Sequence, residues 1–142
     1  VPGIIGFGKA CELAVLRMSE KPRIAELRDY LLNRIYETIP GINLFGDRIN
    51  RLPNTLNIGF EGLAGDTLLI ALDLDGVAVS TGSACISGTG LPSHVLQAMG
   101  IPDSIINSSI RFSLGENTSK LQLDSVVETL VKAVGLNKTA IL

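Results

Sequence analysis

The spacing of apolar residues changes twice along this chain, and each spacing favours a different kind of element. Near the N-terminus apolar residues recur three or four positions apart, as on one face of a helix. Residues 56–60 and 110–114 instead alternate apolar side chains with polar or small ones, as half-buried strands do. The helical spacing returns over residues 121–134. This order predicts an α/β fold in which helices pack on a small sheet.

Two helices are expected before the first strand. The first covers about residues 4–18, and Cys11 lies on its apolar stripe, where we interpret it as a small core residue. Pro22 opens the second helix and Pro40-Gly41 ends it. The buried face of this second helix is expected to carry Ile24, Leu27, Leu31, Ile35 and Ile39.

The later elements are shorter, except for the last helix. Residues 44–46 and 77–79 are expected to be short strands, and Asp66 is expected to cap a helix over residues 67–74. Another helix begins near Pro92 and ends at Gly100. The last helix is expected over residues 121–134, and its buried face should carry Leu123, Val127, Leu130 and Val134.

Composition excludes several classes of protein. The net charge of −2 argues against a nucleic-acid binder, which would show a basic stripe, and no apolar run reaches the length of a membrane span. Two cysteines are too few for a disulfide framework or a zinc site, so no metal is expected and both are interpreted as reduced thiols, as in the cytoplasm. Apolar residues make up 46% of the chain, which suggests surface intended for a partner.

Cys85 lies in a stretch of small residues, Ser80 to Gly90, with one thiol in the middle. Glycine, serine and threonine suit a bending, accessible loop better than a packed core. A free thiol has a pKa of about 8.5 and needs help to ionise at neutral pH, and no Lys or Arg lies within the loop. Cys85 is therefore a candidate nucleophile, with an inert thiol in a turn as the alternative.

Arg111 is the second candidate, on the polar face of the strand over residues 110–114 together with Ser113. If that face meets a cleft, the guanidinium can hold a carboxylate with two parallel hydrogen bonds. The alternative is an ordinary solvent-exposed charge on a strand.

Other polar residues give weaker signals. His94 is the single histidine and could form a protease-like dyad with Cys85, although a helix N-terminus disfavours its charged form. Asn57 is either a hydrogen-bonding site residue or plain strand surface. Asp73 and Asp75 are explained by a helix end and a turn. The glycine-rich stretch lacks the Gly-Lys-Ser/Thr ending of a phosphate loop, so nucleotide binding is not expected.

Taken together, these segments resemble the C-terminal part of cysteine desulfurases, pyridoxal-phosphate (PLP) enzymes of the class V aminotransferase type, in the NifS/IscS-like group. The resemblance covers nearly the whole chain. It rests on RLPNTLN (51–57), ALD (71–73), VSTGSAC (79–85), PSHVL (92–96) and SIRFSLG (109–115).

The resemblance implies a fold, an activity and two site residues. The chain would be the small C-terminal domain of a fold-type I PLP enzyme that converts L-cysteine to L-alanine. Cys85 would attack the substrate sulfur and carry it as a persulfide, and Arg111 would bind the substrate α-carboxylate. An iron–sulfur scaffold or a tRNA-thiolation protein would receive the sulfur, and the enzyme would be a cytoplasmic homodimer.

The family's Schiff-base lysine follows a histidine, and none of the five lysines here does. No cofactor-binding residue is therefore expected in residues 1–142, which would form a single domain whose PLP-binding partner domain belongs to a longer polypeptide. The chain begins Val1-Pro2-Gly3, in keeping with that expectation. Selenocysteine lyase activity, a stand-alone persulfide-carrying or interaction module, and a structural fragment that offers its first helix to a partner stay open as alternatives.

Overall fold

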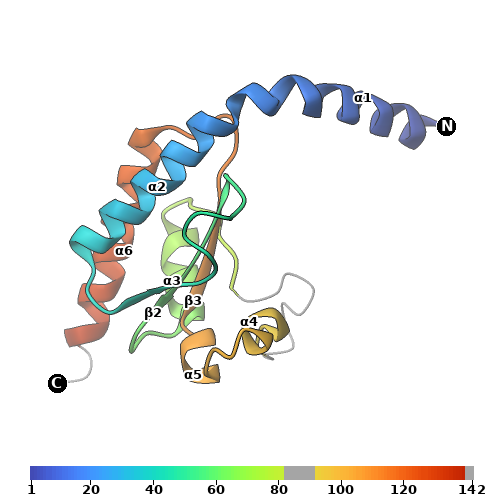
Figure 1. Cartoon of the computed structure of the whole chain (residues 1–142). Coiled ribbons are helices and arrows are strands. Elements are labelled where there is room, and N and C mark those ends of the chain that lie inside the picture. Colours follow the sequence, from blue (N-terminus) through green and yellow to red (C-terminus); the bar gives the residue numbers. More distant parts are fainter. Residues whose placement is uncertain (82–91, 140–142) are drawn as a thin grey trace.

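The computed structural model of the chain describes residues 1–81 and 92–139, with the backbone alone for residues 136–139. Its elements follow the predicted order of helices, then strands mixed with short helices, then a long helix (Figure 1). In chain order they are α1 (Pro2–Leu16), the 3₁₀ turn η1 (Arg17–Glu20), α2 (Lys21–Thr38), β1 (Ile42–Leu44), β2 (Thr55–Phe60), α3 (Gly65–Leu74), α4 (His94–Ala98), α5 (Asp103–Ile106), β3 (Ser109–Ser113) and α6 (Lys120–Thr139).

The three strands form one antiparallel sheet in the order β1-β2-β3. The central strand β2 pairs Phe60 with Ile42 of β1, and it pairs Leu56 with Phe112 of β3. The predicted architecture, helices packed on a small mixed or antiparallel sheet, is confirmed, and the sheet is antiparallel throughout. The first strand lies two residues earlier than predicted, because Gly41, with a φ of 73°, turns the chain three residues after the end of α2 and directly before Ile42.

One face of the sheet carries the main core. The apolar side chains of β2 and β3 point toward α2, α3 and α6, and Figure 1 shows α2 and α6 side by side on this face. The alternating pattern of the two strands therefore correctly predicted which of their side chains are buried. The fully buried members of this core include Leu31, Ile35, Leu56, Ile58, Leu68, Leu72, Ile110 and Leu130.

A smaller apolar cluster lies on the opposite face, where Phe45 packs with Leu96 of α4 and Ile106 of α5. The Phe45 ring lies directly over Gly59 of β2, and a Cβ at Gly59 would come within 2.8 Å of the ring atom Cζ. Gly59 is therefore required by this close contact. The cluster covers one end of the second face and leaves the other end, toward residues 55–57, to polar side chains.

The predicted strand over residues 77–79 is wrong. Within the described part of the chain these residues join no ladder, and only Ser80 forms a bridge, to Arg111 of β3. A cavity of about 390 Å³ lies between residues 75–79 on one side and Phe112, Leu114 and α6 on the other. The two segments therefore meet only beyond the cavity, at Ser80.

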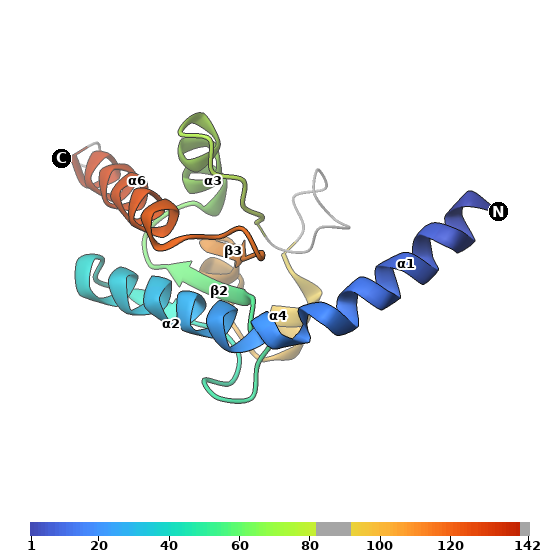
Figure 2. The same cartoon turned by 90° about the horizontal axis from the view of Figure 1, so that it is seen from above.

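Helix α1 differs from its predicted role. It forms where the periodicity predicts, but it buries no residue and extends away from the rest of the molecule in both views (Figures 1 and 2). Cys11 is exposed, so its interpretation as a core residue is wrong for this chain. The apolar periodicity shows that one face of this helix is apolar. No helix or strand of the described chain packs against that face. The exposed apolar residues of this segment include Ile4, Ile5, Phe7, Val15 and Leu16.

The predicted Asp66 cap of α3 is also wrong, because the helix begins two residues earlier than predicted, at Gly65, and its N-cap is Ala64. The Gly65 N–H donates instead to the carbonyl oxygen of Asn107 at 2.8 Å. A backbone acceptor near β3 thus satisfies one of the first N–H groups of α3, which have no partner within the helix. Among the described helices, none is long and apolar enough to cross a membrane.

Candidate active site

The predicted nucleophile Cys85 lies outside the described residues, as do Gly82 to Leu91 around it. The residues that lead into this segment are described. Ser80 exchanges two backbone hydrogen bonds with Arg111, N–H to oxygen at 2.8 Å and 3.2 Å. The methyl group of Thr81 lies beside Gly65, 3.4 Å from where a Cβ of Gly65 would be. The chain therefore enters the cysteine segment from a point held between β3 and the start of α3.

Arg111 occupies the predicted strand and the predicted face. Its neighbours Ile110 and Phe112 are buried in the main core, so its own half-buried side chain lies on the opposite face of the sheet. Among the described residues no carboxylate forms an ion pair with it. A half-buried guanidinium without an anionic partner is able to receive a carboxylate from outside the chain.

Asn57 lies directly across the sheet from Arg111 in the β2–β3 register. Directly opposite residues of an antiparallel pair share a face, so Ser80, Arg111 and Asn57 form a row across three neighbouring segments. The side-chain oxygen Oδ1 of Asn57 is buried and has no hydrogen-bond partner among the described residues. The sequence alone did not decide whether Asn57 is a site residue or ordinary strand surface. The structure places it directly opposite Arg111.

Ser109 is a residue of this face that sequence reasoning missed. It lies two positions before Arg111 on β3, is 1% exposed, and its Oγ has no hydrogen-bond partner within the described chain. The signal was available, because alternation along the strand places Ser109, Arg111 and Ser113 on one face. Ser109 pairs with Gly59, so it lies at the end of the face that Phe45 covers, next to Arg111 along β3. The face thus combines one cation with two buried oxygen atoms, Asn57 Oδ1 and Ser109 Oγ, that have no hydrogen-bond partner among the described residues.

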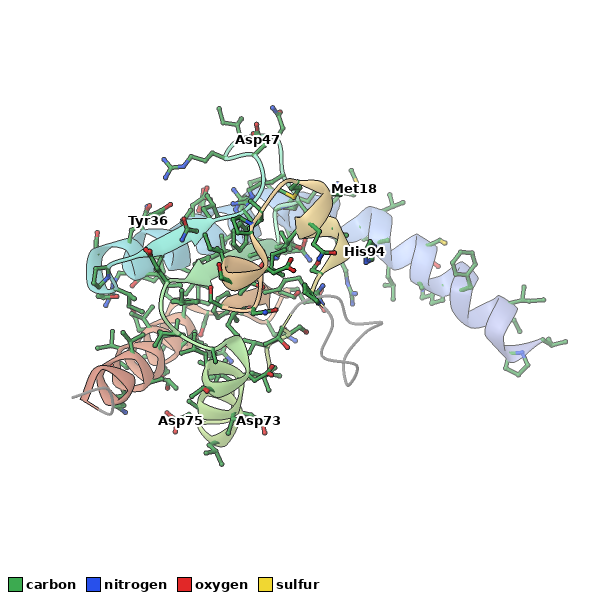
Figure 3. All side chains as sticks on the ribbon, turned by 90° about the horizontal axis from the view of Figure 1, so that it is seen from below. Met18, Tyr36, Asp47, Asp73, Asp75 and His94 are labelled. Carbon is green, nitrogen blue, oxygen red and sulfur yellow. The ribbon has the colours of Figure 1, made fainter. Side chains whose placement is uncertain are left out.

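Other polar candidates lie elsewhere. His94 begins α4 and is exposed, while Ser93 before it accepts a hydrogen bond from the Leu96 N–H at 3.5 Å as N-cap. Asp73 and Asp75 lie at the far end of α3, away from His94 (Figure 3). The Asp75 carboxylate accepts from the Thr129 hydroxyl of α6 at 2.7 Å, which supports a structural role.

Arg51 supports the site from the β1–β2 connection. Its Nη2 donates to the carbonyl oxygen of Phe45 at 2.7 Å, and so fixes the residue that covers Gly59. Burial lowers the pKa of Arg51, and the nearby positive charge of Arg28 lowers it further. An arginine nevertheless stays charged at neutral pH, so Arg51 is a fixed cation beside the Phe45 carbonyl oxygen.

The four lysines whose side chains the structure describes do not lie at this face of the sheet. Lys9 pairs with Glu12 on the projecting helix α1, and Lys120 lies over the ring of Tyr30. Lys21, Lys120 and Lys132 belong to α2 and α6, which cover the opposite face of the sheet. The described part of the chain therefore offers no cofactor lysine near Arg111. In the same part, no three His, Cys, Asp or Glu side chains gather as a metal site would require.

Comparison with known proteins assigns the chain to a family. The model of the family "Aminotransferase class-V" matches residues 1–126. A protein named cysteine desulfurase IscS from Dictyoglomus turgidum is 46% identical over 135 residues, which is 94% of this chain and 34% of that protein. Cysteine desulfurases from Nostoc sp. and Klebsiella pneumoniae are 44% and 41% identical and cover 94% and 90% of this chain.

Solved structures agree with the sequence relatives. A NifS-like protein matches 95% of this chain with a TM-score of 0.81 and 29% identity, and a NifS-like protein from Rickettsia africae matches 92% with a TM-score of 0.79. The chain covers 34% and 33% of those two structures, and about a third of the curated relatives. This chain belongs to the aminotransferase class-V family.

Proposed function

We propose that this chain is the substrate-binding and sulfur-accepting part of a PLP-dependent cysteine desulfurase. Arg111 binds the α-carboxylate of L-cysteine, and Cys85 accepts its sulfur. The observation that carries the proposal is the backbone pairing of Ser80 with Arg111, at 2.8 Å and 3.2 Å. This pairing ties the segment that contains the thiol to the strand that contains the cation.

Covalent geometry makes the two roles compatible. Cys85 follows Ser80 by five residues, and a segment of that length reaches at most ~18 Å when fully extended. The thiol is thus tethered within reach of a substrate held at Arg111, with enough chain to present sulfur beyond the site.

The proposed reaction balances on the residues of this chain and its substrate. The Cys85 thiolate attacks the sulfur of L-cysteine and forms an S–S bond while the substrate C–S bond breaks. The electron pair of the broken bond stays with the carbon, which takes a proton and leaves as L-alanine. When bound, PLP would supply the electron sink for the C–S cleavage, as it does in this family.

The exposed apolar surface of α1 supports the view that this chain functions as part of a longer protein. Five large apolar side chains of this helix are between 65% and 78% exposed, which is costly for a free helix in water. The relatives are about three times as long as this chain, so their additional length can supply the missing layer. We therefore propose that residues 1–142 work as one domain of a longer protein, with PLP bound mainly by the rest.

The partners follow from the same proposal. The persulfide on Cys85 passes to an acceptor protein such as an iron–sulfur scaffold, and the full-length protein is a cytoplasmic homodimer. Selenocysteine lyase activity is not favoured, because the relatives described above are named cysteine desulfurases. A stand-alone carrier is disfavoured by the uncovered surface of α1.

The test uses the full-length protein loaded with PLP. Release of sulfide and L-alanine from L-cysteine is compared between wild type, Cys85→Ser and Cys11→Ser. Cys11 is a matched control, because it is the other of the two cysteines in the sequence and lies on the projecting helix α1. We expect turnover to be lost in Cys85→Ser and kept in Cys11→Ser. Undiminished turnover in Cys85→Ser would refute the role given to Cys85.

A further inference from the structure

We propose that Asn57 is a positioning residue that orients the Arg111 guanidinium toward the substrate carboxylate. This inference rests on the proposed function, since it needs Arg111 to bind a carboxylate. It adds a role for an uncharged residue on the neighbouring strand. Three features of the β2–β3 pair carry it: the type of cross-strand pairing, the unpaired oxygen of Asn57, and the absence of charge on the amide.

The pairing brings the two side chains as close as a sheet allows. Both backbone hydrogen-bonding groups of Arg111 are used by Ser80, at 2.8 Å and 3.2 Å, on the side away from β2. The carbonyl oxygen of Asn57 accepts from the N–H of Phe45, also away from β3. Asn57 and Arg111 are therefore a non-hydrogen-bonded pair, in which the two Cα atoms are about 4.5 Å apart and the side chains are closest.

The chemistry of the two side chains is complementary. Asn57 Oδ1 is a buried acceptor without a donor among the described residues, and a buried acceptor strongly favours a partner. The guanidinium of Arg111 carries five N–H donors in a plane, and a carboxylate bound by a fork uses two of them. A third N–H can therefore bond to Asn57 Oδ1 without competing with the substrate.

The neutrality of Asn57 explains why an amide suits this position. An aspartate of nearly the same shape would form its own ion pair with Arg111 and compete with the substrate carboxylate. An apolar residue would leave the guanidinium free to rotate. The amide oxygen restricts the orientation of the cation and preserves its positive charge for the ligand.

The kinetic test uses the full-length, PLP-loaded protein and compares Asn57→Asp, Asn57→Ala and Ser113→Ala. Loss of one hydrogen bond to a charged group should raise the KM for L-cysteine about tenfold in Asn57→Ala, and more in Asn57→Asp. Ser113 is a matched control, since it lies on the same face of β3 two residues beyond Arg111 and is exposed. Ser113→Ala should keep the KM of wild type.

Coupling to Arg111 distinguishes positioning from a general structural effect. In an Arg111→Ala background, Asn57→Ala should change kcat/KM for L-cysteine by less than about twofold, because the group on which it acts is gone. An equal tenfold loss in both backgrounds would overturn the proposal. So would an unchanged KM in both Asn57 variants.

A crystal structure of the full-length protein with the product L-alanine gives a readout that does not depend on turnover. Asn57 Oδ1 should lie within about 3.2 Å of a guanidinium nitrogen of Arg111, and a clearly longer separation would contradict the proposal. If wild type released no sulfide from L-cysteine, the desulfurase proposal would fail. The crystal structure would still decide whether Asn57 holds the Arg111 guanidinium.

Discussion

Gly65→Ala should destabilise this fold although alanine favours helices. Gly65 is the first residue of α3, and its N–H donates to the Asn107 carbonyl oxygen at 2.8 Å. An added Cβ would lie 2.9 Å from that oxygen and 3.0 Å from the carbonyl oxygen of Ser109. Both are backbone atoms at the start of β3, so they cannot move aside as a flexible side chain would.

The size of the destabilisation follows from the structural elements that must move to relieve the clash. Relief of the clash moves α3 away from β3, which weakens a backbone hydrogen bond with a net contribution of about 1 kcal/mol. Leu68 and Leu72 then move within the main core, and overpacking of this kind costs about 1–3 kcal/mol. The helix propensity of alanine returns at most about 1 kcal/mol. The net loss in the free energy of unfolding is therefore about 1–3 kcal/mol.

Gly135→Ala is the matched control. Gly135 also lies in a helix, α6, but a Cβ there would meet no atom within 4 Å. This variant should be unchanged or more stable by up to about 1 kcal/mol. Urea unfolding of the 142-residue chain, followed by far-ultraviolet circular dichroism, measures both. Equal changes in the two variants, or a more stable Gly65→Ala, would refute the argument from close approach.

Three further predictions concern binding, protonation and accessibility. Arg111→Lys in the full-length protein should raise the KM for L-cysteine at least tenfold, because an ammonium cannot form the two-bond fork; an unchanged KM in steady-state assays would contradict this. Hydrogen bonds from the N–H groups of Asn50 and Ile49 lower the pKa of Asp47 in the folded chain. The ionised carboxylate therefore stabilises the fold at pH values above the unfolded pKa of Asp47, and this stabilisation is lost as the pH falls through the lower folded pKa. An NMR titration in which the Asp47 carboxyl group shows an ordinary pKa would contradict this prediction. Cys11 should react rapidly with iodoacetamide in the 142-residue chain and slowly in the full-length protein, as peptide mapping can measure; equal rates would contradict a covered α1.

Apolar periodicity predicted the parts of the fold whose partners lie within the chain. The inward faces of α2 and α6 were predicted residue by residue, and Leu31, Ile35 and Leu130 are buried as expected. The same periodicity misplaced Cys11, because an apolar stripe does not say whether its covering layer belongs to the same segment. The strand expected at residues 77–79 does not form, and the Val77 N–H donates to the Leu72 carbonyl oxygen of α3 instead of to a neighbouring strand.

The candidate site was predictable only in part for a related reason. Alternation along one strand placed Arg111 on the face opposite the core, since that face depends on local residues alone. The pairing of Asn57 with Arg111 depends on the register between β2 and β3, which join residues far apart in the chain. The bridge to Ser80 has the same origin. Sequence reasoning therefore found the cation and left its neighbours undetermined.

Mapping of the sulfur after a single turnover decides whether Cys85 is the residue that accepts sulfur from L-cysteine. The full-length, PLP-loaded protein is mixed with less than one equivalent of L-cysteine, alkylated at once, digested and analysed by mass spectrometry. We expect one added sulfur atom on the peptide that contains Cys85 and none on the peptide that contains Cys11. Formation of L-alanine with no added sulfur on Cys85, and sulfur found on another residue, would contradict it.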